Sequence, residues 1–245
     1  MTTLQTYEQK QKEFGKLIRT KYHDSRISGK DMCPKNKVVM DMGPAFLTGC
    51  SADFFQTSKE YPSNTLYLVE PHPVCAKFCR EESKDYSNIH VVEKAVSDFN
   101  GECKLYEPTN SECSSILKTN EDAVKKYWPF PLTFGFSFTD KTQVFDVEVV
   151  RLDKIIEDYG ITTIDMLKID IQGEDLRALK SSGKYLHIIK KGSMEAPVSL
   201  QNAIYKNQHT MDDCIQFLES NGFRVSEIEA NDSHNLEVNI HFQQV

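Results

Sequence analysis

Several patterns that would place the chain in a simple class are missing from it. No window of the 245 residues approaches the ~18 consecutive apolar residues of a membrane-spanning helix. The first residues have no apolar core of the kind that a secretory signal needs. The chain also lacks an internal repeat and a low-complexity tract. With 39% hydrophobic and 27% charged residues, the composition is typical of a soluble globular protein, and we expect a cytoplasmic location.

Positive charge is in short supply as well. The chain has 29 Lys and Arg against 36 Asp and Glu, which gives a formal net charge of -7. Unspecific binding to nucleic acid or to anionic lipid depends on a surplus of Lys and Arg, so we expect neither as a partner. The seven cysteines include no CxxC pair, and this pattern predicts neither a disulfide framework nor a zinc site.

Glycine-rich loops that bind phosphate are absent too. Gly43 is followed by PAFLT before the next glycine, Gly49, so no GxGxxG pattern forms. Pro44 removes a backbone amide that a pyrophosphate would use, and no Walker-type GK[ST] follows any strand. The pattern therefore favours a nucleoside without phosphates over a dinucleotide or a nucleoside triphosphate.

Segments typical of strands and helices alternate from Lys37 onward. The predicted strands are 38–42, 65–70, 89–96, 102–107, 143–150, 164–171, 186–194, 223–230 and 236–242. The predicted helices are 51–60, 73–84, 174–181 and 211–221. Alternation of this kind indicates βαβ units and a mostly parallel sheet that is covered on both faces. The last two strands are joined by a short, turn-rich link, which predicts an antiparallel hairpin.

Two segments depart from this alternation. Residues 1–30 are polar and predict an N-terminal helical cap, whereas 31–245 has a suitable length for a single domain. Between the strands at 102–107 and 143–150 we expect a long loop and no helix. It includes an aromatic-rich insertion at 118–141.

Acidic residues follow the first two predicted strands. Asp41-Met42-Gly43 ends one strand and Glu70-Pro71 ends the next, and the carboxyl ends of such strands form the ligand crevice of an open α/β sheet. Glycine lets backbone amides approach a ligand, and a carboxylate such as Glu70 can accept hydrogen bonds from both ribose hydroxyls. S-adenosylmethionine is a nucleoside without phosphates, and its sulfonium cation suits a site lined by Asp41, Glu70 and Asp170. Alternatively, Asp41 and Glu70 only cap the helices that follow them.

The stretch ITTIDMLKIDIQGEDLRAL, residues 161–179, is the most informative one. Strand side chains alternate between faces, so Lys168 and Asp170 emerge together near the carboxyl end of this strand. This placement favours chemistry at the junction. An ion pair at the rim of the sheet, with Gly173 only making the turn, is the simpler alternative.

From about Lys37 to Phe242 the chain resembles the FkbM family of S-adenosylmethionine-dependent methyltransferases. The motifs that carry the resemblance are VVMDMG, LVEPHP, KAVSD, the long stretch VVRLDKIIEDYGITTIDMLKIDIQGEDLRALKSSGKYL, FLESNGFRV and NIHF. The resemblance implies a Rossmann-like class I methyltransferase fold of the α/β class, with a mostly parallel seven-stranded sheet, an antiparallel C-terminal hairpin and helices on both faces. It also implies S-adenosylmethionine as the cofactor.

Position by position, the resemblance assigns a role to each strand end. Asp41, Gly43 and the adjoining Pro44 would meet the methionine moiety, and Glu70-Pro71 the ribose. Ala95, Val96 and Ser97 would lie beside the adenine, and Asp170 beside the transferring methyl group.

The chain departs from the family pattern in two places. Leu47 stands where the family has a second Gly, four residues after the first, and the next glycine here is Gly49; Gln172 and Asp175 stand where the family has Glu. Glutamine keeps a hydrogen-bond acceptor but loses the charge, so we do not expect Gln172 to act as a base or a metal ligand.

The resemblance implies an O-methyltransferase that acts on a hydroxyl, with a sugar or glycan as the acceptor. An alcohol must lose its proton, and Asp170 is the first candidate for the base, with Glu195 as the second. Lys168 would stabilise the developing alkoxide or hold Asp170, and His72 is expected to be a surface loop residue. Two carboxylates, Asp170 and Glu195, without a third ligand are too few to predict a metal site.

Two further questions concern the acceptor. Aromatic faces pack on the apolar surfaces of sugars, so the insertion predicts an acceptor platform formed by Tyr127, Trp128, Phe130 and Phe134; a flap that completes the core or a subunit contact is the alternative. Other readings of the whole chain are a methyltransferase for a carboxylate or a small secondary metabolite, and a catalytically silent module that binds a nucleoside or a protein.

Overall fold

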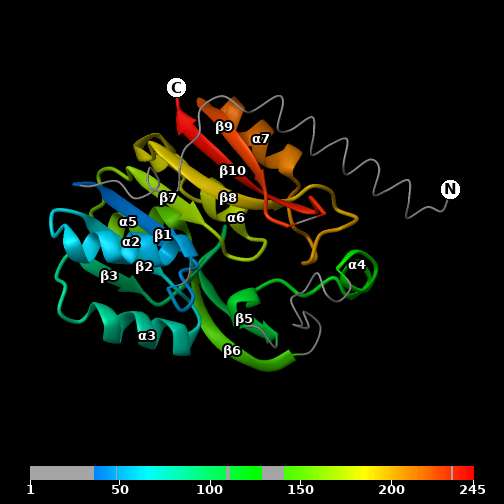
Figure 1. Ribbon diagram of the computed structural model, residues 1–245, viewed down its shortest axis with the longest axis horizontal. Coiled ribbons are helices and arrows are strands. Elements are labelled where there is room, and N and C mark those ends of the chain that lie inside the picture. The colour runs from blue at the N-terminus through cyan, green and yellow to red at the C-terminus, as the bar shows by residue number, and fades with distance from the viewer. Residues whose placement is uncertain (1–35, 48, 109–110, 129–140, 233) are drawn as a thin grey trace.

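The computed structural model describes residues 36–47, 49–108, 111–128, 141–232 and 234–245, shown in colour in Figure 1. The expected cap at 1–30 and the side chains of Phe130 and Phe134 lie outside the described residues. The strands are β1 (Val38–Met42), β2 (Thr65–Val69), β3 (Ile89–Val92), β4 (Ala95–Val96), β5 (Gly101–Pro108), β6 (Lys141–Val150), β7 (Met166–Ile169), β8 (Lys191–Pro197), β9 (Phe223–Ala230) and β10 (Glu237–Gln244). The helices are α2 (Gly49–Glu60), α3 (Pro73–Ser83), α4 (Glu121–Tyr127), α5 (Leu152–Tyr159), α6 (Asp175–Lys180), α7 (Met211–Ser220) and the 3₁₀ helices η2 (Ser111–Cys113) and η3 (Gly183–Ile188).

Seven of these strands form the main sheet, in the order β3-β2-β1-β7-β8-β10-β9. Strands β3, β2, β1, β7 and β8 run parallel, whereas β10 pairs antiparallel with both β8 and β9. The predicted mostly parallel sheet with an antiparallel C-terminal hairpin is confirmed. The strand order reverses between β1 and β7, and in an open α/β sheet a ligand crevice lies at such a switch point.

Alternating side chains bury both faces of this sheet. On one face, Met40 and Tyr67 pack in the main core cluster with α5, α6 and α7. On the other face, Val39 and Leu66 pack with Phe54 of α2 and with α3. The period of two along each strand therefore sends neighbouring residues into two separate cores, as the apolar runs of the sequence predict.

A second, smaller sheet lies beside the carboxyl end of the main one, with the order β4-β6-β5. The single strand predicted at 89–96 is wrong, because the chain leaves the main sheet after Val92 and Ala95–Val96 pair with β6 instead. The expectation of no helix between 102–107 and 143–150 is wrong too, since η2 and α4 form there. The strand predicted at 186–194 is the 3₁₀ helix η3 followed by β8, and α5 was not predicted.

Gly43 follows β1 directly and lies against the end of β7 at the switch point. Its φ is +82°, and a Cβ at this position would lie 1.8 Å from the backbone oxygen of Asp170. Only glycine combines this backbone conformation with so close an approach. The ends of β1 and β7 are therefore held against each other at the place where the pocket opens.

Candidate active site

One pocket lies at the carboxyl ends of β1, β2 and β7 and encloses about 580 Å³ together with its open mouth. Of the residues predicted from the sequence, those that line the pocket are Gly43, Glu70, Pro71, Ala95, Val96 and Asp170. The other predicted site residues, which do not line it, are Asp41, Pro44, Ser97, Lys168 and Glu195. The opposite wall is formed by Leu105 of β5 and by Ser115 and Ile116, which follow β5 in the chain.

Glu70 is held rigidly at the end of β2. Its Oε2 accepts a hydrogen bond from the backbone amide of Ala45 at 2.9 Å, and its Oε1 accepts one from that of His72 at 2.8 Å. Burial raises the pKa of Glu70 to about 7, although these two hydrogen bonds oppose the shift. The first turn and the second strand end are thus joined through one carboxylate that still faces the pocket.

Asp41 lies behind the pocket wall and contacts Lys168. The Asp41 side chain is fully buried, and neither of its oxygens has a hydrogen-bond partner. The Lys168 Nζ lies 3.5 Å from Asp41 Oδ1 and 3.2 Å from Asp170 Oδ2. Burial raises the pKa of Asp41, and Lys168 opposes this shift. Burial alone would lower the pKa of Lys168, but Asp170 and Asp41 outweigh it and the pKa is raised, so Lys168 stays charged.

Asp170 stands at the mouth of the pocket with both oxygens oriented. Lys168 donates to Oδ2 at 3.2 Å, and the amide of Gln172 donates to Oδ1 at 2.9 Å. The expectation that Lys168 and Asp170 emerge together is confirmed. Gln172 has a positive φ of +57°, which is uncommon for a residue with a side chain.

An apolar slot with a polar end forms the other half of the pocket. Ala95 and Val96 of β4 and Leu105 of β5 line it. Ser97, just beyond β4, is buried and donates a hydrogen bond to Glu174, which lines the pocket and also accepts from Arg177 at 2.7 Å. Glu174 was missed in the sequence because it is simply the residue before a helix, and only the fold brings it next to Ser97.

Three further carboxylates are gathered beside Asp170. Asp175, in the first turn of α6, accepts from the backbone amides of Gly173 and Glu195. Burial, followed by Asp170, raises the pKa of Asp175 to about 7, that of Glu237 to about 8 and that of Glu195 well above its usual value. Within the described ranges no group of three or more His, Cys, Asp or Glu is arranged to hold a metal ion.

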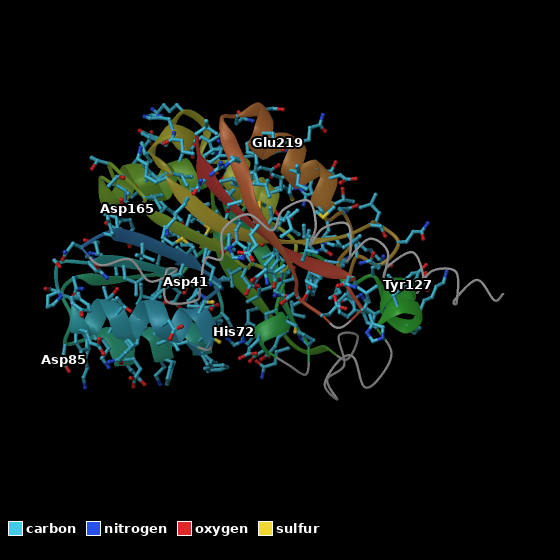
Figure 2. All side chains as sticks on the ribbon, turned by 45° about the horizontal axis from the view of Figure 1, so that its top comes forward. Asp41, His72, Asp85, Tyr127, Asp165 and Glu219 are labelled. Atoms are coloured by element: carbon cyan, nitrogen blue, oxygen red, sulfur yellow. The ribbon has the colours of Figure 1, made fainter. Side chains whose placement is uncertain are left out.

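His72 is a structural residue and not the exposed loop residue that the sequence suggested. It is only 3% exposed, its Nδ1 accepts from the backbone amide of Cys75 to cap α3, and its Nε2 lies 3.3 Å from Glu107 of β5. Since Nδ1 accepts, Nε2 carries the proton and donates to Glu107. Figure 2 shows His72 and Asp41 near the middle of the molecule and Asp165, before β7, at the other end of the sheet.

The prediction that Trp128 belongs to an acceptor platform is wrong. Its indole is buried with Val124, Ile204 and Tyr205, and Nε1 donates to the backbone oxygen of Asn202 at 2.8 Å. A ring packed in this cluster presents no face to a ligand. Tyr127, labelled on α4 in Figure 2, is half-buried and packs against the same cluster.

The pocket fits a nucleoside that carries a positive charge. Glu70 faces the pocket with both oxygens fixed, which suits a diol, because each carboxylate oxygen can accept more than one hydrogen bond. The carboxylate of Asp41 is buried behind the wall, and that of Asp170 lines the pocket. Negative charge in a partly closed site favours a cation. The apolar slot beside Ala95 and Val96 suits a flat base.

Comparisons with known proteins agree with a pocket for such a nucleoside. The family model described as the methyltransferase FkbM domain matches residues 49–225, which is well over half of the chain.

Two relatives with assigned names are similar to parts of the chain. The 2-O-methyltransferase NoeI of Sinorhizobium fredii (strain NBRC 101917 / NGR234) is 25% identical over 114 residues, which are 46% of this chain and 46% of that protein. The methyltransferase sdnD of Sordaria araneosa is 25% identical over 164 residues, which are 60% of this chain and 61% of that protein. The chain therefore matches less than two thirds of either relative.

Among solved structures, a SAM-dependent methyltransferase from Aquifex aeolicus is similar, with a TM-score of 0.44 and 9% sequence identity over 97% of this chain and 98% of that one. The assignment of the fold rests on the strand order described above.

Proposed function

We propose that this chain, which belongs to the FkbM methyltransferase family, transfers a methyl group to a hydroxyl oxygen, most simply that of a sugar or glycan. The family match over residues 49–225 is the premise, and the cofactor is S-adenosylmethionine. When bound, this cofactor supplies a methyl group that is attached to a positively charged sulfur. The sulfur is a good leaving group. The observation that carries the proposal is the place of Asp170, a carboxylate that lines the pocket and has both oxygens oriented by donors.

Methyl transfer depends first on position. The acceptor oxygen must be held roughly 3 Å from the methyl carbon and in line with the leaving sulfur. In our proposal Glu70 binds the ribose, the Gly43 turn with Asp41 and Pro44 meets the methionine moiety, and Ala95, Val96 and Ser97 surround the base. These residues fix the donor at the carboxyl end of the sheet.

Asp170 then takes the proton of the acceptor hydroxyl. A neutral alcohol is a weak nucleophile, and a carboxylate within hydrogen-bond reach assists by accepting its proton as the new bond forms. Lys168 holds Asp170 from the other side, since its Nζ lies 3.2 Å from Oδ2. The alternative base, Glu195, has its side chain turned to Asn231, whose amide donates to its Oε1 at 2.6 Å, so we assign it a supporting role.

A hydroxylated acceptor fits this end of the pocket. Its wall carries carboxylates that can accept hydrogen bonds from hydroxyl groups, Asp170, Glu112 and Glu174, and the hydroxyl group of Ser115. A carboxylate acceptor would meet like charges there, which is unfavourable. The relative from Sinorhizobium fredii bears a name with 2-O-methyl transfer, which supports oxygen as the atom that is methylated.

The test begins with calorimetric titration of S-adenosylmethionine and of its demethylated product. We expect micromolar binding to the wild type and a loss of about 10-fold or more in Glu70→Ala, since a fixed charge-assisted hydrogen-bond pair would be removed. Glu60→Ala, which removes an exposed carboxylate at the end of α2, is the control and should bind normally. Failure of the folded wild type to bind would favour the silent module.

Transfer of labelled methyl from S-adenosylmethionine to a panel of methyl glycosides and oligosaccharides, beside carboxylate and amine compounds, then tests the acceptor class. Asp170→Asn should bind the demethylated product, which lacks the positive charge, as tightly as the wild type but lose about 100-fold or more in kcat. Methylation of amines or carboxylates in preference to hydroxyls would contradict the proposal.

A further inference from the structure

Gln172 makes an unusual set of contacts for a residue in a turn. It follows β7 with φ at +57°, a backbone conformation that persists in a residue with a side chain only where its surroundings hold it. Ser115 Oγ donates to its backbone oxygen at 2.6 Å, and its side chain reaches both Asp170 and Tyr205. The strain thus serves to place the amide between these two residues.

The chemistry of the partners fixes the direction of this amide. The carboxylate of Asp170 only accepts hydrogen bonds, so the NH₂ group of Gln172 must face it, 2.9 Å from Oδ1. The amide oxygen therefore faces the hydroxyl of Tyr205, which donates to it at 2.8 Å. Tyr205 is 3% exposed, and burial raises its pKa well above the usual value, so this hydroxyl keeps its proton.

Tyr205 is itself fixed from several sides. Its hydroxyl proton is shared between the Gln172 amide oxygen and the backbone oxygen of Cys113, which both accept at 2.8 Å, and its backbone amide donates to the Gln208 side chain at 2.8 Å. The ring packs with Val124, Trp128 and Ile204. The segment that closes the pocket and the loop before α7 therefore converge on one hydroxyl.

Charged and titratable groups face Asp170 from every neighbouring element. They are Lys168 on β7, Asp41 on β1, Cys50 on α2, Cys113 in η2, Asp175 on α6, Glu195 on β8, Glu237 on β10 and Tyr205 in the loop before α7. Lys168 is the one cation in this set, whereas carboxylates are numerous. A residue that contacts Asp170 without adding a negative charge therefore matters for its protonation.

We propose that Gln172, held in place by Tyr205, is a positioning residue that orients Asp170 and keeps it available as the proton acceptor. The inference rests on the proposed function. The amide donates to one oxygen, Lys168 donates to the other, and the remaining lone pairs of the carboxylate point to the acceptor. A carboxylate at position 172, which is the residue that the family has there, would instead lie beside Asp170 and favour its protonated form in this chain, because like charges close together disfavour the charged form.

Gln172→Glu tests the charge. We expect the acid limb of the kcat/KM profile, measured with the acceptor found in the methyl-transfer panel, to move to higher pH by about one unit or more, with unchanged affinity for the demethylated product, which carries no sulfonium charge. Gln56→Glu is the matched control: the Gln56 amide also donates to a carboxylate, Glu60, at 2.9 Å, but in solvent. It should leave the profile in place.

Tyr205→Phe tests the positioning. This change adds no charge and leaves the ring packed, but frees the Gln172 amide. We expect kcat to fall about 10-fold with little change in KM for the acceptor. Tyr185→Phe removes a hydroxyl that donates to Glu157 at 3.0 Å on the surface, and should leave both constants unchanged.

A second readout needs no acceptor and no cofactor. The side-chain carbon of Asp170, labelled with ¹³C and assigned by its loss in Asp170→Asn, can be followed by NMR as the pH is changed. Its titration midpoint should rise in Gln172→Glu and stay in place in Gln56→Glu. Equal midpoints in all of these proteins would overturn the inference. Failure to bind S-adenosylmethionine would overturn the proposed function alone, because this titration concerns the apo protein.

Discussion

The two ends of the pocket treat buried carboxylates in different ways. At the end formed by β1 and β2, Glu70 has a separate backbone amide for each oxygen. At the end formed by β7, β8 and β10, Asp175 and Glu237 lie near Asp170 and raise one another's pKa values after burial has done so. Burial raises the pKa of Glu70 to about 7 as well, and Asp175 also accepts from two backbone amides, so the two ends differ in the number of carboxylates that lie together. A single carboxylate fixed on the pocket wall is suited to holding a ligand in one pose, whereas a group of carboxylates close to Asp170 competes for protons and is suited to proton transfer.

Gly43 lies where β1 meets β7, between the two ends of the pocket. Its replacement should give the largest loss of stability. In Gly43→Ala the new Cβ would lie 1.8 Å from the backbone oxygen of Asp170, so β1 and β7 would have to separate. We expect the free energy of unfolding to fall by about 4 kcal/mol or more and cofactor binding to be lost. Urea denaturation followed by circular dichroism, with calorimetry for binding, measures both.

Gly222→Ala is the control for this experiment. Gly222 has φ of +81°, nearly the same conformation, but nothing lies within 4 Å of the position of its Cβ. The change should therefore lower stability by only about 1 kcal/mol, from backbone strain, and leave binding intact. Similar losses in the two variants would show that the contact with Asp170 is not what requires a glycine at position 43.

The change Glu237→Gln tests how stability at the Asp170 end of the pocket depends on pH. The pKa of Glu237 is raised to about 8 by burial and by Asp170, so its contribution to stability is full below its ordinary value of 4.5 and is lost as the pH rises through about 8. We expect the variant to gain up to about 4 kcal/mol relative to the wild type between pH 5 and pH 9. Melting temperatures across this range measure the difference.

The change Glu219→Gln serves as the reference for that measurement. Glu219 is an exposed residue of α7, labelled in Figure 2 far from the pocket. It should follow the wild-type curve at every pH. If Glu237→Gln also followed the wild-type curve, the buried Glu237 would not lower stability at high pH. The difference between the two ends of the pocket would then be lost.

The main sheet was predictable because its signals are local. Apolar runs bounded by Gly and Pro marked β1 and β2, and the short link before the last strand marked the antiparallel hairpin. The pair of Lys168 and Asp170 followed from the alternation of side chains along one strand. In these regions each short stretch of sequence carries the information that the fold uses.

The second sheet and the group of carboxylates beside Asp170 were harder to predict, because their contacts join distant parts of the chain. Nothing near Ala95 shows that it pairs with Val149. Tyr205 meets Gln172 across 33 residues, and Glu237 approaches Asp170 only after β10 has paired with β8. The helix α4 is short and buries just Ala123 and Val124, which is too weak a pattern to distinguish from an aromatic loop.

Trp128→Phe separates a packing role from a ligand-binding role and should give the smallest effect. The indole is 6% exposed and donates to Asn202 at 2.8 Å, so the change removes one buried hydrogen bond and part of a ring that packs on Tyr205. We expect a loss of roughly 1–2 kcal/mol in the free energy of unfolding and unchanged affinity for the cofactor. Because the cluster supports Tyr205 without touching the acceptor, KM for the acceptor should also stay the same. A rise in KM with no loss of stability would restore the aromatic platform that the sequence predicted.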